Sequence, residues 1–382
     1  MGSKRVPEVR FKGFSGEWDE CKIVDVLNIN SGRDYKHLKK GDIPVYGTGG
    51  YMHSVNDKLS DDDAIGIGRK GTINKPQLLL APFWTVDTLF YMTVKGKNDL
   101  YFLYSLANKI DWKKYDESTG VPSLSKNSIY KISINVPLLR EQTRIGNFFK
   151  QLDETIAIQQ QELDTLKQTK QGFLQKIFPK EGKSMPEIRF PEFYEKWEKY
   201  QLGDLSKIRR GASPRPIQDP KWFDDESDVG WLRISDVTEQ NGLIHFVEQH
   251  ISKEGQRKTL VLNEPHLILS IAATVGKPVI NYIKTGIHDG FIVFMEPNFN
   301  IEFMFHWLEM FRPQWQKYGQ PGSQVNLNSE LVREQQISLP SIDEQTKIGN
   351  FFKQLDETIA LYEQELNVLK QTQKAFLQKM FV

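Results

Sequence analysis

Residues 141–179 read EQTRIGNFFKQLDETIAIQQQELDTLKQTKQGFLQKIFP, and residues 344–382 read EQTKIGNFFKQLDETIALYEQELNVLKQTQKAFLQKMFV. The two stretches begin 203 positions apart (344 − 141), and most of their residues are identical. An internal repeat of this length indicates a duplicated architecture, and it decides how the rest of the chain is divided.

A second, weaker repeat lies in front of each copy. Residues 6–11 read VPEVRF and residues 185–190 read MPEIRF, a separation of 179 positions (185 − 6). Globular and long segments are therefore predicted to alternate twice, and the second globular segment is the longer one. The predicted parts are a first domain over 1–140, a central helix over 141–179, a second domain over 180–343 and a C-terminal helix over 344–382.

The long segments are predicted to be helices with a coiled-coil seam. Their apolar residues recur at alternating spacings of four and three, which is the 3.5-residue period of a coiled coil. Three polar seam residues, Gln159, Lys170 and Gln373, are expected to fix the register at some cost in stability. Ser341 and Glu344 match a capping box at the start of the second helix, whereas the first copy has Leu138 in place of the serine.

The two helices are expected to pair with each other in one chain, antiparallel and related by a pseudo-two-fold axis. Roughly 37 residues at about 1.5 Å per residue make a rod of about 55 Å. The alternative is that the helices serve only to dimerise the protein.

The globular segments are predicted to be two α+β domains of common ancestry. Strands are expected at 64–68, where the residues alternate, and at 90–94 in the first domain, and at 229–234, 267–271 and 291–294 in the second. Each domain also has a candidate helix, near 100–110 and near 301–310. Most loop residues differ between the two domains. Near-identical helices indicate one partner surface presented twice, and divergent domains indicate two different targets.

Composition excludes several classes of protein. The 382 residues allow two or three domains, and 39% of them are hydrophobic, enough to form cores. No apolar run is long enough to span a membrane, and the N-terminus lacks a secretory signal. The only cysteine, Cys21, excludes a disulfide framework, and a cytoplasmic protein is expected. The net charge of +1 contrasts with the basic character that is usual for proteins that bind nucleic acid.

No catalytic or metal-binding motif is found in the sequence. There is no phosphate-binding P-loop, no H-E-x-x-H motif and no glycine fingerprint for a dinucleotide. His245 and His250 make a poor ligand pair, and residues 224–226 are interpreted as a solvated acidic turn. We therefore expect neither enzymatic activity nor a metal site.

Several loops instead combine basic side chains, glycine and hydrogen-bonding groups. Glycine lets a backbone approach a phosphate, while Arg, Lys, Ser, Asn and Gln bind phosphates or base edges. Each loop taken singly suits an ordinary solvated turn, but their matching order in two homologous domains favours DNA binding. The candidate DNA-binding residues are Arg33, Lys36, Tyr46, Thr48, Arg69, Lys70, Ser123, Arg209, Arg210, Ser213, Arg215, Arg233, Ser235, Gln324 and Asn326.

This layout resembles the specificity subunit of Type I restriction-modification systems. The resemblance covers essentially the whole chain and is carried by residues 136–142 with 339–345, and by residues 41–50, 230–237 and 275–278. One departure is Asn74, which stands where the second domain has Gly276. The resemblance implies a host-defence protein without catalytic activity, in which two target recognition domains each read half of a split DNA site.

The resemblance also implies partners. The helices would set the spacer between the half-sites and dock two modification (methyltransferase) subunits, which bring S-adenosylmethionine for DNA methylation. Separate restriction subunits would bring ATP and Mg for translocation and cleavage. The candidate docking residues on the helices are Phe149, Leu152, Ile156, Leu163, Leu166, Phe352, Leu355, Ile359, Leu366 and Leu369. The alternative is a coiled-coil adaptor whose two heads bind peptides or carbohydrates, which the salt dependence of DNA binding would distinguish.

Overall fold

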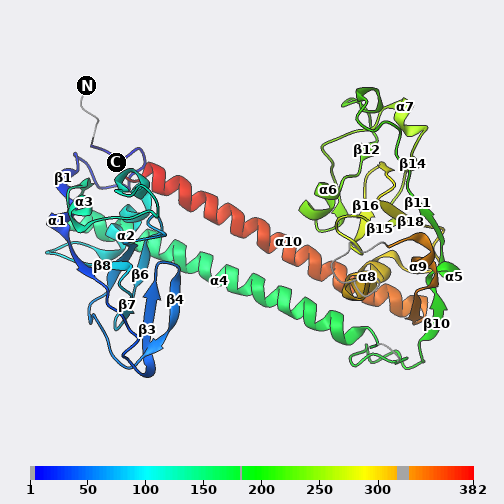
Figure 1. Cartoon of the computed structure of the whole chain (residues 1–382), viewed down its shortest axis with the longest axis horizontal. Helices are drawn as coiled ribbons and strands as arrows, with labels where there is room; N and C mark the ends of the chain where they lie inside the picture. The colour runs from blue at the N-terminus through cyan, green and yellow to red at the C-terminus, as the bar shows by residue number, and fades with distance from the viewer. Residues whose placement is uncertain (1–4, 181–182, 316–326) are drawn as a thin grey trace. The chain divides into compact units, whose positions relative to one another are not determined.

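The chain divides into two compact units that share its two long helices. The computed structural model describes residues 5–180, 183–315 and 327–382. The first unit consists of residues 1–161 and 363–382, and the second of residues 162–362. Helix α4 (Leu139–Ile177) and helix α10 (Ile342–Lys379) each contribute one part to each unit (Figure 1). The predicted mixture of helix and sheet in each domain is confirmed.

The first unit contains a four-stranded sheet of order β2-β8-β5-β6 and a three-stranded sheet of order β4-β3-β7. β1 pairs with β9, the strand that leads into α4. The strands are β1 (Asp19–Lys22), β2 (Leu27–Ser31), β3 (Lys40–Gly47), β4 (Gly50–Val55), β5 (Ala64–Gly68), β6 (Gln77–Leu79), β7 (Trp84–Thr85), β8 (Leu89–Val94) and β9 (Ser133–Val136). The helices before α4 are α1 (Ile23–Val26), α2 (Leu100–Lys109), the 3-10 helix η1 (Trp112–Tyr115) and α3 (Lys126–Tyr130).

The second unit repeats this plan with additions. Its larger sheet has the order β11-β18-β15-β16-β13, and its smaller sheet has the order β12-β17-β14. The strands are β10 (Glu198–Gln201), β11 (Lys207–Arg210), β12 (Gly230–Trp231), β13 (Leu243–Ile244), β14 (Leu260–Leu262), β15 (Leu267–Ser270), β16 (Pro278–Asn281), β17 (Thr285–Ile287), β18 (Phe291–Met295) and β19 (Gln336–Leu339). The helices before α10 are α5 (Leu202–Leu205), the 3-10 helix η2 (Pro220–Trp222), α6 (Ile234–Glu239), α7 (Lys253–Gln256), α8 (Ile301–Trp315) and α9 (Ser329–Glu334).

Two sequence expectations about strands need correction. The run 64–68 was expected to alternate between faces, but all five residues of β5 are buried because neighbouring elements cover both faces of this strand. In the run 229–234 only Gly230 and Trp231 form a strand, and Ile234 already begins α6.

The long helices pair in an antiparallel manner within each unit. In the first unit, Phe148 of α4 packs edge-to-face on Phe376 of α10, with ring centroids 5.1 Å apart. In the second unit, Phe173 of α4 packs in the same way on Phe351 of α10, also at 5.1 Å. These four positions are related by the 203-residue repeat, so the same contact forms twice with the helices exchanged. The predicted antiparallel pairing is thereby confirmed.

The capping box expected at the start of α10 forms only in half. The backbone N–H of Glu344 lies 3.4 Å from the Ser341 hydroxyl, as a capping box requires. The Glu344 carboxylate, however, accepts two hydrogen bonds from Arg189 instead of turning back to the helix. An ion pair to the segment before β10 has replaced the second half of the box.

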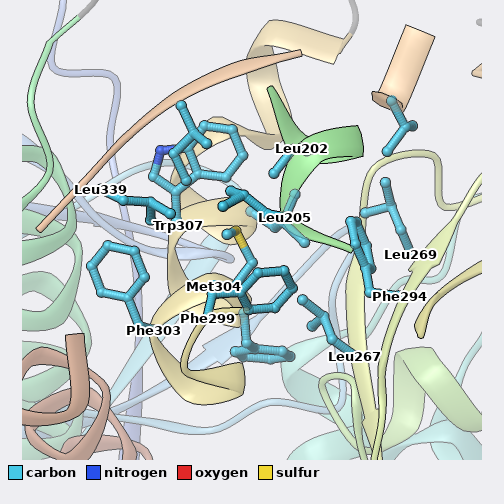
Figure 2. Close-up of a cluster of buried hydrophobic side chains, with 14 of the residues drawn as sticks. Leu202, Leu205, Leu267, Leu269, Phe294, Phe299, Phe303, Met304, Trp307 and Leu339 are labelled. Atoms are coloured by element: carbon cyan, nitrogen blue, oxygen red, sulfur yellow. The ribbon is translucent and has the colours of Figure 1, made fainter. Parts of the chain in front are cut away.

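Each unit has an apolar core that includes the C-terminal end of one long helix. In the second unit, Leu202, Leu267, Phe294 and Phe303 pack together, as Figure 2 shows. Phe178, just beyond α4, joins this core and packs on Phe303 with ring centroids 5.3 Å apart. Burial of such side chains contributes about 25 cal/mol per Å² of apolar surface, so this core holds the helix end to the domain.

Candidate nucleic-acid interface

In the first unit, two candidate loops leave the same end of the larger sheet. Strand β2 ends at Ser31, paired with Phe90, and strand β5 ends at Gly68, paired with Leu89. The loops that follow carry Arg33 on one side of β8 and Arg69 with Lys70 on the other. The topology thus brings these three predicted residues to one sheet end.

Backbone hydrogen bonds hold these loops in place. The N–H of Arg33 donates to the carbonyl of Thr85 at 2.9 Å, and the N–H of Arg69 donates to the carbonyl of Thr88 at 2.7 Å. Lys70 forms an isolated bridge with Ser123, which joins a third predicted loop to the same place. Asp116 accepts hydrogen bonds from the N–H groups of Ser123 and Ser118, and these bonds lower the pKa of its carboxyl.

The cations at this sheet end are held by no acid that the structure describes. Among the described residues, no carboxylate forms an ion pair with Arg33, Arg69 or Lys70. The guanidinium of Arg69 and the ammonium of Lys126 both lie over the Phe90 ring, 5.8 and 5.9 Å from its centroid. Sequence reasoning missed Lys126, which becomes a candidate only because α3 places it beside Arg69.

A glycine shapes the start of the candidate loop in both units. A Cβ atom on Gly32 would lie 2.0 Å from the Val86 carbonyl oxygen, and one on Gly211 would lie 2.2 Å from the His288 carbonyl oxygen. Only glycine allows the loop to cross the neighbouring turn so closely. Gly32 and Gly211 are 179 positions apart, the separation found for the weaker repeat.

The remaining candidates of the first domain lie on the β3–β4 hairpin or beside it. The hairpin is tied to the larger sheet, because Gln77 donates to the Gly47 carbonyl at 2.9 Å and the Val86 N–H donates to the Tyr46 carbonyl at 3.0 Å. Thr48 lies at its tip. Lys36 lines a groove of about 520 Å³ beside the hairpin, together with Tyr35, Leu38, Lys39, Lys40, Gly41, Tyr51, His53, Ser54 and Val55.

We call this the lysine groove, after Lys36, Lys39 and Lys40. Within the described part of the chain no acidic side chain lines it, and Tyr51 is 63% exposed. Basic and aromatic side chains together are the kind of surface that binds a nucleic-acid backbone. Of these lining residues, sequence reasoning selected only Lys36, because no local sequence pattern predicts that β4 brings Tyr51 and His53 into the same groove.

In the second unit, the corresponding sheet end is organised around one aspartate. Strand β11 ends at Arg210, paired with Ile292, and β15 ends at Ser270, paired with Phe291. Asp289 lies in the turn before β18. Its carboxylate accepts hydrogen bonds from Ser213 at 2.7 Å and from Arg215 at 2.8 Å. Arg210 donates from Nε to the Asp289 carbonyl at 2.7 Å.

The other candidates of the second domain are placed differently. Arg209 lies on β11 and forms no ion pair with any acid in the described ranges, whereas Arg233 pairs with Asp236 at 3.2 Å and with Glu248 at 2.7 Å. Hydrogen bonds to these two carboxylates raise the pKa of Arg233 and anchor its guanidinium. Ser235 is exposed on α6. Gln324 and Asn326 lie outside the described residues.

The candidate docking residues on the long helices are mainly packing residues. Phe149 and Phe352 are 2% and 0% exposed inside the cores of their units. Leu163, Ile359 and Leu366 are also buried, and the other five are half-buried: Leu152, Ile156, Leu166, Leu355 and Leu369. Apolar residues that are exposed on the helices lie elsewhere, and include Leu139, Ile158, Ile342, Leu361 and Val368. Docking through the seam residues stays a prediction.

Other reactive groups have ordinary surroundings. Burial, with smaller contributions from Asp25 and Asp19, raises the pKa of Cys21 to about 11, so that it remains a neutral thiol at neutral pH. His245 stacks on Tyr282 with ring centroids 4.5 Å apart. Within the parts of the chain that the structure describes, no group of three or more His, Cys, Asp or Glu residues is arranged to hold a metal ion. No described helix is long and apolar enough to cross a membrane.

Comparison with known proteins relates most of the chain to one family. The model of the Type I restriction modification DNA specificity domain matches residues 15–168 and again residues 194–371. The MjaVIII Type I restriction enzyme specificity subunit of Methanocaldococcus jannaschii is 24% identical over 341 residues, which cover 83% of this chain and 75% of that protein.

Two solved structures share the fold. The crystal structure of a Type I restriction-modification S subunit from M. genitalium matches with a TM-score of 0.72 and 14% identity, covering 99% of both chains. A structure from work on complex assembly and conformational transition of the Type I system matches with a TM-score of 0.55 and 17% identity, covering 95% of this chain and 97% of the other.

Proposed function

The chain belongs to the Type I restriction-modification DNA specificity family, and we propose that its two domains read the two unlike halves of one split DNA site. Members of this family are non-catalytic specificity subunits that act on DNA in complex with other restriction-modification subunits. The recognition surfaces proposed here are the two corresponding sheet ends, at Arg33 and Arg69 in the first domain and at Arg210 and Arg215 in the second.

One observation carries this proposal. The two domains have corresponding sheet ends, yet the charged side chains at these two ends are paired differently. The first sheet end presents cations that no described acid pairs with, and the second presents arginines held by Asp289. Phosphate contacts position a protein on DNA, whereas fixed donors and acceptors discriminate bases. Two different sets of donors on one scaffold suit two different half-site sequences.

The duplicated helices supply corresponding surfaces for the partner subunits. Leu139 and Ile342 are 41% and 55% exposed, and Ile158 and Leu361 are 59% and 53% exposed. The members of each pair are 203 positions apart. Exposed apolar side chains repeated at equivalent positions suit two copies of one partner, and we assign them to two modification subunits.

The cofactors of the reaction are assigned to partner subunits. Cofactor-binding activities in this family belong to those subunits. S-adenosylmethionine would be bound by the modification subunits, and ATP with Mg by the restriction subunits. The contribution of this chain is to position the methyltransferase on the correct sequence.

A domain exchange tests the proposal. The assembled complex of this chain with its modification partner is expected to methylate one split motif, mapped across a genome. Replacing residues 1–140 with the same segment of another family member should change one half of that motif and leave the other half intact. A change in both halves, or in neither, would contradict the assignment of one domain to one half.

A binding measurement separates DNA recognition from a role as an adaptor for other ligands. Duplex binding by the assembled complex should weaken steeply as salt is added, because each phosphate contact releases condensed counterions. Binding without such a slope would favour an adaptor whose heads bind another class of ligand.

A further inference from the structure

Asp289 is the centre of the sheet end in the second domain. It lies between β17 and β18, and three of its oxygen atoms accept hydrogen bonds from β11 and the loop that follows it. Its carboxylate oxygens Oδ1 and Oδ2 accept from Ser213 and Arg215, and its carbonyl oxygen accepts from Nε of Arg210. One residue therefore sets the direction of two guanidinium groups.

The two arginines keep N–H donors that can bind another acceptor. The Arg215 side chain is 74% exposed, against 39% for Asp289. A guanidinium has five N–H donors, and the hydrogen bond to Asp289 occupies only one of those on Arg215. The Nη groups of Arg210 are likewise left for another acceptor, since only its Nε faces the Asp289 carbonyl. A guanidinium fixed in this way is ready to bind two acceptors on the edge of a guanine.

We propose that Asp289 is a specificity-positioning residue, whose carboxylate orients Arg215 beside the Arg210 that its main-chain carbonyl holds, so that the second domain discriminates bases in its half-site. This inference rests on the proposed function, because it assumes that the second domain reads DNA. Preorganisation is the physical basis: a side chain that is already held in its binding geometry loses less entropy on binding, and it tolerates fewer wrong partners.

The ionisation state of Asp289 supports this role. The hydrogen bond from Ser213, with a further contribution from the positive charge of Arg215, lowers the pKa of the Asp289 carboxyl. The group is therefore a carboxylate at neutral pH, and its contact with Arg215 is a charge-assisted hydrogen bond, which is shorter and stronger than a neutral one.

The first domain offers a matched comparison. Asp87 occupies the equivalent turn, since Asp87 precedes β8 by two residues just as Asp289 precedes β18. Asp87 is exposed, and no described cation forms an ion pair with it. The same residue type at the same place therefore organises arginines in one domain only.

The test uses the assembled complex with its modification partner, and duplexes in which each base of the split motif is varied in turn. Asp289→Asn keeps the shape of the side chain but removes its charge. It is expected to reduce discrimination by about 10-fold at one or more positions of the half read by the second domain. Discrimination in the other half and the thermal unfolding midpoint are expected to stay as in the parent.

Two further variants distinguish positioning from a merely structural role. Arg215→Ala removes an exposed side chain and should relax the same positions. The double variant, Asp289→Asn with Arg215→Ala, should be no worse than Arg215→Ala alone at those positions, because Asp289 acts through the arginine. Asp87→Asn, the matched control, should leave the half read by the second domain unchanged.

The inference would be overturned if Asp289→Asn discriminated bases as well as the parent does, or if it lost discrimination equally in both halves of the motif. Strictly additive effects in the double variant would also overturn it. So would relaxation of the same positions by Asp87→Asn. If the unaltered complex methylates no split motif, the proposed function itself fails. The result with the unaltered complex therefore separates the two failures.

Discussion

Arg189 donates two parallel hydrogen bonds to Glu344, from Nε to Oε1 and from Nη2 to Oε2, each 2.7 Å long. The Glu344 side chain is 1% exposed and that of Arg189 is 12% exposed. In the first unit, Arg10 and Glu141 make the same bidentate pair at the same distances. Each pair connects the segment before the first strand of a domain to the first turn of a long helix.

Breaking one of these pairs is expected to be costly. Glu344→Gln leaves a mostly buried guanidinium without its counter-charge, and should lower the free energy of unfolding of the second unit by about 3 kcal/mol. Urea unfolding followed by tryptophan fluorescence measures this. Glu17→Gln is the control, because Glu17 pairs with Arg5 at the surface and the change should cost within about 0.5 kcal/mol. Equal effects of the two substitutions would contradict the prediction.

Lys170 is expected to matter more than its repeat equivalent, Gln373. Lys170 lies 2.6 Å from Asp356 and 3.2 Å from Glu309, and Glu309 also pairs with Lys277. Lys170→Met should destabilise the second unit by about 3 kcal/mol, because the partly buried carboxylate of Asp356 would lose its lysine and retain the contact with His306, while Glu309 would retain Lys277. Gln373→Met, at the equivalent place in the first unit, should cost less than about 1 kcal/mol. Amide hydrogen exchange along α4 and α10 resolves the two effects, and a larger loss of stability from Gln373→Met would refute the argument.

The same cluster predicts how stability depends on pH. Burial opposes the charge on Glu309, but Lys170 and Lys277 outweigh it and lower the pKa of Glu309 to about 2. A carboxyl group whose pKa is lowered by folding stabilises the folded state at pH values above its unfolded pKa, about 4.5. This stabilisation is lost as the pH falls from 4.5 toward 2.

Protection of α8 from hydrogen exchange should therefore fall over this pH range. Glu309→Gln should flatten that dependence. In the first unit, burial raises the pKa of Asp153, so protonation of this residue at low pH stabilises the folded state instead of destabilising it. A pH profile that Glu309→Gln leaves unchanged would show that another group is responsible.

The lysine groove is expected to hold DNA phosphates without reading sequence. Replacing Lys36, Lys39 and Lys40 by alanine should weaken the binding of all duplexes alike. The slope of log K against log salt should fall by about 0.9 for each phosphate that is no longer neutralised. Alanines at Lys113 and Lys114, on the 3-10 helix η1 of the same unit, are the control. Altered base preference instead of a uniform weakening would show that the groove contacts bases.

The exposed apolar positions of the helices are expected to dock the partner. Ile158→Asp and Leu361→Asp should weaken co-purification with the modification subunit, while changing the stability of the chain by no more than about 0.5 kcal/mol. Leu163→Asp and Leu366→Asp place a charge at buried positions and should instead lower the stability of the chain itself. Sedimentation analysis of the mixed subunits distinguishes the two. Full assembly with both exposed positions altered would exclude this face.

The sequence by itself determined the duplicated plan and the helix pairing. A seam that repeats every 3.5 residues has few alternative structures, because its apolar face must be buried along its whole length. Arg33, Arg69 and Arg215 were also found from sequence, since glycine and basic residues mark loops that approach an anion.

Only the tertiary structure decided which of the described cations are held by an acid and which are not. Lys126 and Arg69 both lie over the Phe90 ring, and Asp289 binds Arg215, which is 74 residues earlier in the chain. Such pairings depend on which strands become neighbours, and no local pattern encodes that. Periodicity therefore specified the long helices, whereas long-range strand pairing specified the chemistry of the two sheet ends.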